Sequence, residues 1–268
     1  MKLLFISLSL IHLSCAILRP KDEGCMSPVE YHSKSSQQIF ADAVKIVERP
    51  SEKKAVAFCV FGSKKLYTHG VLENIDLAKK FYPGWDVVIF FDSETVPKDI
   101  IEQAKQKGAI TKVSPEFNHA SARFYVADMD YDRFISRDAD SRIYPREVAA
   151  VADWMKNDWA ILHNMRDEAG HSNPMLAGMW GAQVKPLRKR LKKFDHQSNM
   201  EKLYKAYIGN RKEVFGDDEN FLRDKILKAV GVDHFLTHES VRCDAFPHSR
   251  GFPIPRNDEE HIGSKVVL

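Results

Sequence analysis

Short apolar runs alternate with amphipathic segments along most of this chain, beginning at residue 54. Residues 55–61 form an uninterrupted apolar run that ends at Gly62, and this pattern predicts a buried strand. Apolar residues then recur at helical spacing over residues 71–81, and a Pro-Gly pair at residues 83–84 ends the predicted helix. The folded part of the chain therefore begins as a strand followed by a helix.

The same alternation continues through the middle of the chain. We expect further strands at residues 86–91, 109–113, 133–136 and 159–163, and helices at residues 97–107, 121–128 and 145–156. Strands that alternate with helices predict an α/β fold, with a mainly parallel central sheet flanked by helices and a helical C-terminal part. In such sheets ligands bind outside the carboxyl ends of the strands.

The N-terminal segment has the composition of a targeting sequence. Residues 1–16 carry one lysine and then an apolar run, with Ser14 and Ala16 at the minus-three and minus-one positions of a possible cleavage site. The run is short for a membrane span, which needs about 20 residues, so an uncleaved anchor is the second choice after a signal peptide. In both cases we expect the protein in the secretory pathway, either secreted or in the lumen of the ER or Golgi. Contact with a membrane is expected only through such an anchor.

Residues 17–53 are mostly polar and are interpreted as a tether, with a short helix near residues 38–47, so that residues 54–268 form a single domain. Removal of the leader leaves Cys25, Cys59 and Cys243. One disulfide and one free thiol are compatible with this odd number, but the pairing is left open. Cys59 lies within an apolar run and is interpreted as a core thiol.

The charge of the chain gives no sign of a nucleic-acid partner. It has 40 basic and 37 acidic residues and a formal net charge of +3. A basic cluster at residues 185–193 alternates with leucines, which favours a solvated helix face over a patch for an anionic partner.

The strongest chemical signal is a D-x-D sequence at a predicted strand end. Asp138 and Asp140 follow the run 133–136, and in an extended chain side chains two residues apart face the same side. Two carboxylates suit Mg²⁺ or Mn²⁺, which often share their remaining positions with substrate phosphates. Arg137 and Arg142 flank the pair and are expected to bind phosphate oxygens of a donor. The alternative is a polar turn in which these arginines pair with the two aspartates.

A second loop, residues 166–181, has features that suit a sugar. His171 supplies a polar group, Gly178 allows close approach, and Trp180 offers an aromatic wall for the apolar face of a carbohydrate. The alternative for Trp180 is a place in the core. We expect the donor site to form from three loops, at residues 61–70, 137–142 and 165–181, with Asp138 within about 15 Å of the backbone at Gly62.

Several segments in order resemble the GT-A type glycosyltransferases, which use nucleotide sugars. These segments are R-F-I-S-R-D-A-D-S-R-I-Y-P-R-E from residue 133, H-N-M-R-D-E-A-G-H-S-N-P-M-L-A-G-M-W-G from residue 163, N-I-D-L-A-K-K-F-Y-P-G-W from residue 74, G-D-D-E-N-F-L from residue 216, and the tail F-P-I-P-R with Ile262-Gly263. The resemblance covers roughly residues 55–263. It implies a GT-A-like fold and transfer of a sugar, hexosyl or related, to a carbohydrate or glycoprotein acceptor.

The resemblance also implies roles for single residues. Asp138 and Asp140 match the D-x-D that holds Mn²⁺ or Mg²⁺ on the donor diphosphate, and His238 is the candidate for a late metal-binding histidine. Gly62 and Arg123 are assigned to the donor side. Asp218 matches the aspartate that opens a later helix, although Glu219 stands where the family has glutamine.

If the anomeric configuration inverts, a carboxylate must deprotonate the acceptor hydroxyl. Asp218 and Asp167 are the candidates, with plain helix capping and a turn pair with Arg166 as the respective alternatives. We expect the dipole of a helix at residues 220–227 to keep Asp218 ionised.

Two other classes of function compete with this reading. A haloacid-dehalogenase-like phosphatase also uses D-x-D, but normally on its first strand and without an arginine at the place of Arg142. A non-catalytic secreted sugar-binding protein of transferase-like fold is the other alternative. The sequence leaves open the nucleotide, the sugar, the acceptor, the stereochemical course and the oligomeric state.

Overall fold

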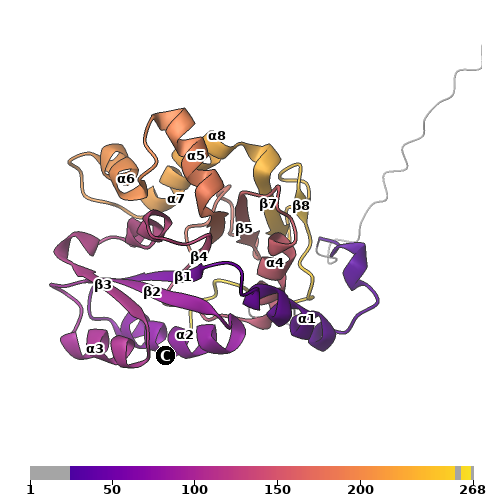
Figure 1. Cartoon of the computed structure of the whole chain (residues 1–268), viewed down its shortest axis with the longest axis horizontal. Coiled ribbons are helices and arrows are strands. Elements are labelled where there is room, and N and C mark those ends of the chain that lie inside the picture. Colours follow the sequence, from indigo (N-terminus) through magenta and orange to yellow (C-terminus); the bar gives the residue numbers. More distant parts are fainter. Residues whose placement is uncertain (1–24, 257–260, 267–268) are drawn as a thin grey trace, which may run out of the picture.

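The computed structural model describes residues 25–256 and 261–266 and contains one eight-stranded sheet (Figure 1). The strands are β1 (Lys54–Val60), β2 (Trp85–Asp92), β3 (Ile110–Ser114), β4 (Arg133–Arg137), β5 (Leu162–Arg166), β6 (Met179–Gln183), β7 (Phe235–Glu239) and β8 (Ser249–Arg250). Their order is β3-β2-β1-β4-β6-β5-β7-β8, and only β6 runs antiparallel to its neighbours. The expected α/β fold with a mainly parallel sheet is confirmed.

Helices cover both faces of this sheet. They are α1 (Ser36–Glu48), α2 (Lys65–Phe81), α3 (Lys98–Gln106), α4 (Pro145–Met155), α5 (Val184–Asp195), α6 (Met200–Ile208), α7 (Asp217–Phe221) and α8 (Lys228–Val230). A π-helical stretch, Leu222–Leu227, joins α7 to α8, and 3₁₀ helices lie at Val29–Tyr31, Pro115–Phe117, Ala120–Asp128 and Val232–His234. The expected helical region is thus residues 184–230, which precede β7, β8 and an irregular tail.

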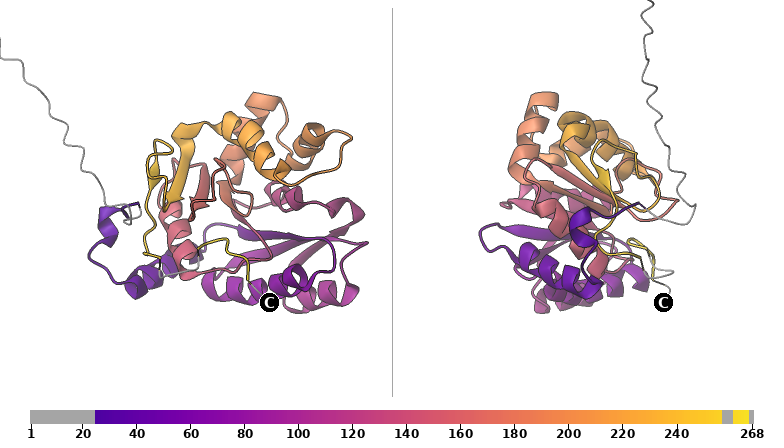
Figure 2. Two further views of the ribbon diagram at one scale, coloured as in Figure 1. Left: turned by 180° about the vertical axis from the view of Figure 1, so that it is seen from behind. Right: turned by 90° about the vertical axis from the view of Figure 1, so that its right-hand side faces the viewer.

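The two layers of the core follow from the alternation of side chains along each strand. In β1, Val56 and Phe58 face the layer of α1 to α4, whereas Ala55 and Ala57 face the layer of α5 to α8. Figures 1 and 2 show α2 and α3 on one side of the sheet and α5 to α8 on the other. The carboxyl ends of β1 and β4 lie side by side because these two strands are parallel neighbours.

The described part of the predicted tether is packed on the domain. Ser35 and Gln38 form a capping box at the start of α1, and the helix buries Ile39, Ala43 and Val47 in the core beside α4. A disulfide joins Cys25 to Cys243, while Cys59 is a buried free thiol. The predicted leader lies outside the described residues. No described helix has the length and apolar character needed to cross a membrane.

Two expectations about strands were wrong. The strand expected at residues 159–163 begins at Leu162 because Trp159 and Ala160 belong to a turn, in which Ala160 N donates to Asn157 O over 3.0 Å. The second expectation was a loop over residues 165–181, whereas β6 begins at Met179 and inserts between β4 and β5. A five-residue strand with a glycine in its centre has too little periodicity to be read from sequence.

Candidate active site at the end of β4

Asp138 is the first residue after β4, and its carboxylate is held from two sides. Arg123 Nη1 lies 3.0 Å from Asp138 Oδ1, and the backbone of Gly178 lies against the other oxygen. A Cβ atom added at Gly178 would lie 1.8 Å from Asp138 Oδ2, so a side chain at this position would have to displace the Asp138 carboxylate. About a third of the Asp138 side chain, 36%, stays exposed, which leaves the carboxylate accessible from solvent.

Arg123 connects the D-x-D to a second acidic residue. It comes from the 3₁₀ helix Ala120–Asp128, is 5% exposed, and donates through Nη2 to Asp218 Oδ2 over 3.2 Å. Its Nη1 also lies 3.7 Å from Cys59 Sγ in β1, so Arg123 bridges the end of β1 and Asp138. The loop before β6 contributes as well, because Ala177 O accepts from Arg123 Nε.

Asp140 lies in a different environment from Asp138. Its exposure is 6%, and the nearest cation in the described part of the chain is Lys265, whose Nζ lies 3.8 Å from Asp140 Oδ2. Burial, and then the charge of Asp138, raise the pKa of Asp140. The two carboxylates are therefore close enough to repel each other, and Asp140 has little to compensate its charge.

Asp218 lies in the first turn of α7, where Gly216 is the N-cap residue. Asp218 Oδ1 accepts from Glu219 N over 2.9 Å, and Oδ2 accepts from Arg123. Burial raises the pKa of Asp218, and Arg123 opposes this effect. The expected helix at residues 220–227 is a π-helical stretch after the short α7, and burial has a larger effect on the pKa of Asp218 than any stabilisation of its charge.

Arg137 and Arg142 do not present free guanidinium groups to a ligand. Arg137 is 1% exposed and pairs with the buried Glu147 at 2.8 Å, while it also donates to Gly178 O. Arg142 Nε donates to Glu73 over 2.7 Å, and Nη1 donates to carbonyl groups of the turn. Both side chains hold the turn that carries the D-x-D, and their assignment to donor phosphate stays a prediction. The alternative, pairing with Asp138 and Asp140, does not occur.

Asp167 and His238 have structural contacts in place of the expected catalytic and metal-binding ones. Asp167 is fully buried, forms two hydrogen bonds with Arg146, and accepts from Ile262 N in the tail. His238 is fully buried and uses both ring nitrogens, one with Asp153 and one with His163. Both side chains are thus engaged in contacts within the fold, and their catalytic and metal-binding assignments stay predictions. The partner of Asp167 is Arg146 and not Arg166.

The three residues expected to bind the acceptor, His171, Gly178 and Trp180, have different surroundings. Trp180 is 1% exposed and packs edge-on against Phe124 and Phe134, so it belongs to the core and cannot serve as a sugar platform. Gly178 lies against Asp138. His171 lies in the loop after β5 beside His261 and Glu168, a group that the sequence pattern does not reveal.

Gly62, which was expected on the donor side, has a positive φ of 78°, and its amide donates to Thr95 Oγ1 over 2.7 Å.

A pocket of about 330 Å³ opens elsewhere, between the start of α1, the start of α4 and the tail. Its lining residues are Ser36, Gln37, Phe40, Tyr144, Pro145, Arg146, Ile254, Pro255, Arg256 and Ile262. None of the site residues predicted from sequence lines it, so this pocket lies away from Asp138 and its partners.

Comparisons with known proteins give structural likeness only. No family model matches this chain, and no curated protein matches it in sequence. Among solved structures, glucosyl-3-phosphoglycerate synthase from Mycobacterium tuberculosis, in complex with Mn²⁺ and UDP-glucose, is 12% identical, with 72% of this chain and 83% of that chain covered and a TM-score of 0.44. Mannosyl-3-phosphoglycerate synthase from Rubrobacter xylanophilus is 10% identical, with coverage of 76% and 74% and a TM-score of 0.47. A mannosyltransferase from Pyrobaculum calidifontis, in complex with GDP-Man and Mn²⁺, is 10% identical, with coverage of 65% and 59% and a TM-score of 0.41.

Two of these solved structures contain a nucleotide sugar, the donor type of the class that the sequence segments resemble. The likeness concerns the fold alone.

Proposed function

We propose that this protein is a metal-dependent glycosyltransferase that moves a sugar from a nucleotide-diphosphate donor to a hydroxyl acceptor. The observation that carries the proposal is the trio of Asp138, Arg123 and Asp218 at the carboxyl edge of the sheet, with Asp140 beside it. This edge is where ligands bind in open parallel sheets. Glycosyl transfer needs both a cation site for a diphosphate and a carboxylate near the acceptor, and the trio brings the two together.

The D-x-D pair fits a divalent cation. Asp138 is accessible and Asp140 is nearly buried. Arg123 and Lys265 do not fully neutralise the two carboxylates, because Arg123 is shared with Asp218 and Lys265 lies 3.8 Å from Asp140. Carboxylate oxygens with open positions for water and phosphate are the donor set of Mg²⁺ and Mn²⁺. When bound, such an ion stabilises the negative charge that develops on the leaving diphosphate.

In this proposal Arg123 positions the two aspartates and Asp218 accepts a proton. Arg123 positions Asp138 and Asp218 on one guanidinium, which fixes the spacing between the donor side and the acceptor side of the site. Asp218 takes the proton of the acceptor hydroxyl, because its raised pKa makes it a better base than an exposed aspartate. Each of its oxygens accepts one hydrogen bond from the described residues, so lone pairs remain for the incoming hydroxyl.

The acceptor class and the cellular location belong to the same proposal. A carbohydrate or glycoprotein acceptor in the secretory pathway fits the leader-like residues 1–16 and the disulfide between Cys25 and Cys243, since disulfides persist in oxidising compartments.

The test is a donor screen with the full secreted chain. We expect Mn²⁺-dependent release of nucleoside diphosphate from one nucleotide sugar of a panel that varies base and sugar, and EDTA should abolish it. Asp138→Asn serves as the negative control, because it keeps the shape of the side chain and removes the charge. Absence of Mn²⁺-dependent binding of every nucleoside diphosphate in calorimetry would contradict the proposal. Donor binding without hydrolysis or transfer would favour the sugar-binding alternative.

A further inference from the structure

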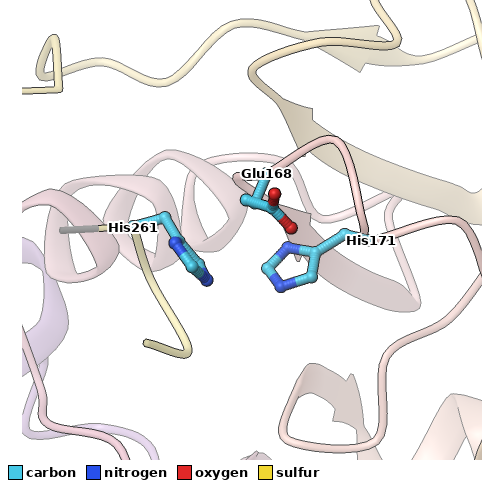
Figure 3. A group of neighbouring side chains, drawn as sticks. All are labelled: Glu168, His171 and His261. Carbon is cyan, nitrogen blue, oxygen red and sulfur yellow. The ribbon is translucent and has the colours of Figure 1, made fainter. Parts of the chain in front are cut away.

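A second group of metal-ligand side chains lies outside the trio. It consists of Glu168 and His171, from the loop after β5, and His261 from the C-terminal tail (Figure 3). One donor atom from each residue lies within 4.8 Å of the others, and all three side chains are half-buried. Neither Asp138 nor Asp140 belongs to this group, so it is a separate cluster in the described part of the chain.

The two imidazole rings meet edge to face, with centroids 5.2 Å apart and an interplanar angle of 74°. In Figure 3 the Glu168 carboxylate lies beside the His171 ring, and the His261 ring faces it from the other side. Two residues of the loop and one from a segment about 90 positions later in the chain thus direct nitrogen and oxygen donors at one place. Hydrogen bonding does not explain this convergence, because no bond among the described residues joins the three side chains.

Among the described residues, the Glu168 carboxylate keeps unused lone pairs, whereas one ring nitrogen of His171 already accepts a hydrogen bond. Glu168 forms no ion pair with any lysine or arginine in the described ranges, and its Oε2 accepts only from Gly170 N over 2.8 Å. His171 has an unprotonated ring nitrogen that carries a lone pair. That lone pair, on Nδ1, accepts from Asp167 N over 3.1 Å, and a bound metal ion exchanges this hydrogen bond for a coordinate bond.

We propose that Glu168, His171 and His261 bind a divalent transition-metal ion. Two imidazole nitrogens and one carboxylate oxygen with an open fourth position form a set typical of Zn²⁺. Zn²⁺ also outranks Mn²⁺ for nitrogen ligands, whereas the all-oxygen D-x-D pair favours Mg²⁺ or Mn²⁺. The two sites are therefore distinguished by ligand chemistry as well as by position.

The metal site fastens the tail over the proposed active site. Immediately after His261, Ile262 N donates to Asp167 over 3.0 Å, and Val266 N donates to the backbone oxygen of Asp140 over 3.0 Å. Lys265, between them, faces the Asp140 carboxylate at 3.8 Å. A metal ion that joins His261 to the β5 loop thus holds the segment that covers Asp140. The site itself does not depend on the proposed transferase activity.

The experiment is a titration of the tag-free, metal-stripped full chain with ZnCl₂ by calorimetry, repeated with Co²⁺ so that its visible absorption reports the ligands. We expect one Zn²⁺ site in the wild type that His171→Gln and His261→Gln each weaken by at least about 100-fold. His32→Gln is the matched control, because His32 is exposed and lies outside the cluster. Affinity should fall between pH 7.5 and pH 5.5, since protons compete for the imidazoles.

The Asp138→Asn/Asp140→Asn double variant separates the two sites. The proposal requires this variant to keep the high-affinity Zn²⁺ site and its Co²⁺ spectrum. Loss of the site in this variant together with its survival in His171→Gln would overturn the proposal, as would a wild type that binds no Zn²⁺. If one histidine variant fails to fold, as judged by circular dichroism, Glu168→Gln and the other histidine variant decide the result.

Discussion

The two carboxylates of the D-x-D differ in what holds them before any ligand binds. Asp138 has a buried guanidinium as its partner, whereas Asp140 has only a solvent-exposed lysine at 3.8 Å. Replacement of each by asparagine therefore has a different effect on the stability of the protein without metal, although both changes remove one charge.

We predict that Asp138→Asn lowers the free energy of unfolding by about 1 kcal/mol in the absence of metal, because buried Arg123 loses one of its two ion pairs. The partial exposure of Asp138 keeps this loss small. Urea denaturation in EDTA measures it. In the presence of Mn²⁺ the difference in the free energy of unfolding between the wild type and the variant should increase, since only the wild type gains stability from the ion.

Asp140→Asn should leave the stability in EDTA unchanged or raise it. The folded-state pKa of Asp140 is raised, so the fold disfavours its charged form, and stability from this group falls as pH rises through the folded pKa. The advantage of the variant is therefore expected at pH 7 and should disappear below the unfolded value of 3.8. A variant that is equally destabilised at both pH values would instead indicate an essential hydrogen bond.

Asp218 is the residue on which the chemistry of transfer depends in our proposal. We predict that Asp218→Asn lowers the rate of sugar transfer by a factor of about 10² to 10⁴ and leaves the affinity for nucleoside diphosphate unchanged. Steady-state transfer and calorimetric binding measure the two effects.

Asp217→Asn is the matched control for this change. Asp217 lies in the same turn of α7 and is nearly buried, but it pairs with Arg211 and not with Arg123. We expect it to alter stability with little effect on transfer. Equal activity of Asp218→Asn and the wild type would show that Asp218 is only structural.

At the scale of elements, the strand β6 matters because the segment before it packs on the end of β4. Arg137 and Met179 are register partners, so Gly178 is held next to Asp138. The close contact needs the absence of a side chain and not an unusual backbone conformation.

We predict that Gly178→Ala weakens Mn²⁺ binding at least about tenfold and lowers the free energy of unfolding by about 1–3 kcal/mol, because the new methyl group displaces the Asp138 carboxylate. A double-mutant cycle with Asp138→Ala tests the cause. The second change removes the obstructing carboxylate, so the cost of Gly178→Ala should shrink by more than about 0.5 kcal/mol. If the losses of the two single variants add up in the double variant, the cost of Gly178→Ala does not come from its contact with Asp138.

Glu213 anchors the segment before α7 to the 3₁₀ helix that carries Arg123. It accepts from Ser121 Oγ and from Ala120 N, each over 2.7 Å, and from Tyr204. Burial alone would raise the pKa of Glu213, but hydrogen bonds from neighbouring side chains lower it to about 2.

A lowered folded-state pKa means that Glu213 adds stability that is complete above its unfolded value of 4.5 and is lost as pH falls toward about 2. We predict that Glu213→Gln is less stable than the wild type at pH 7 by roughly 3 kcal/mol, and that the gap narrows below pH 4.5. Thermal melts from pH 7 to pH 2.5 measure this gap. A constant gap across that range would contradict the lowered pKa.

At the scale of the whole molecule, the disulfide between Cys25 and Cys243 closes a loop of 218 residues and ties the segment before α1 to the segment after β7. A crosslink over so long a loop restricts the unfolded chain strongly. The buried Cys59 thiol is protected from reagents in the solvent, and burial raises its pKa to about 11.

We predict that Cys243→Ser, or reduction of the wild type, lowers the free energy of unfolding by up to about 5 kcal/mol. Melts with and without reductant measure the loss. Thiol titration of the mature protein gives the control, since one thiol should react, and only after denaturation. Two or more reactive thiols in the unreduced protein would contradict this pairing.

The sequence by itself determined the alternation of strands and helices and the position of Asp138 directly after a strand. Periodicity is local, and an apolar run such as residues 55–61 or 133–136 has few conformations that bury it. The carboxyl edge of the sheet as the place of the candidate site follows from the same alternation, because parallel strands end together.

Only the tertiary structure decided which charges meet. Arg123 pairs with Asp138 and Asp218, which lie at other positions in the chain. Arg137 pairs with Glu147 and Arg142 with Glu73. Local spacing does not show which of these arginines meets the aspartates. His238 and Asp167 looked like functional residues because polar groups at strand ends are common in sites, yet their partners come from helix α4 and the tail. Ion pairs and hydrogen bonds are short-ranged and depend on packing between distant segments, so the sequence pattern predicts the edge of the sheet and the packing selects the residues that act there.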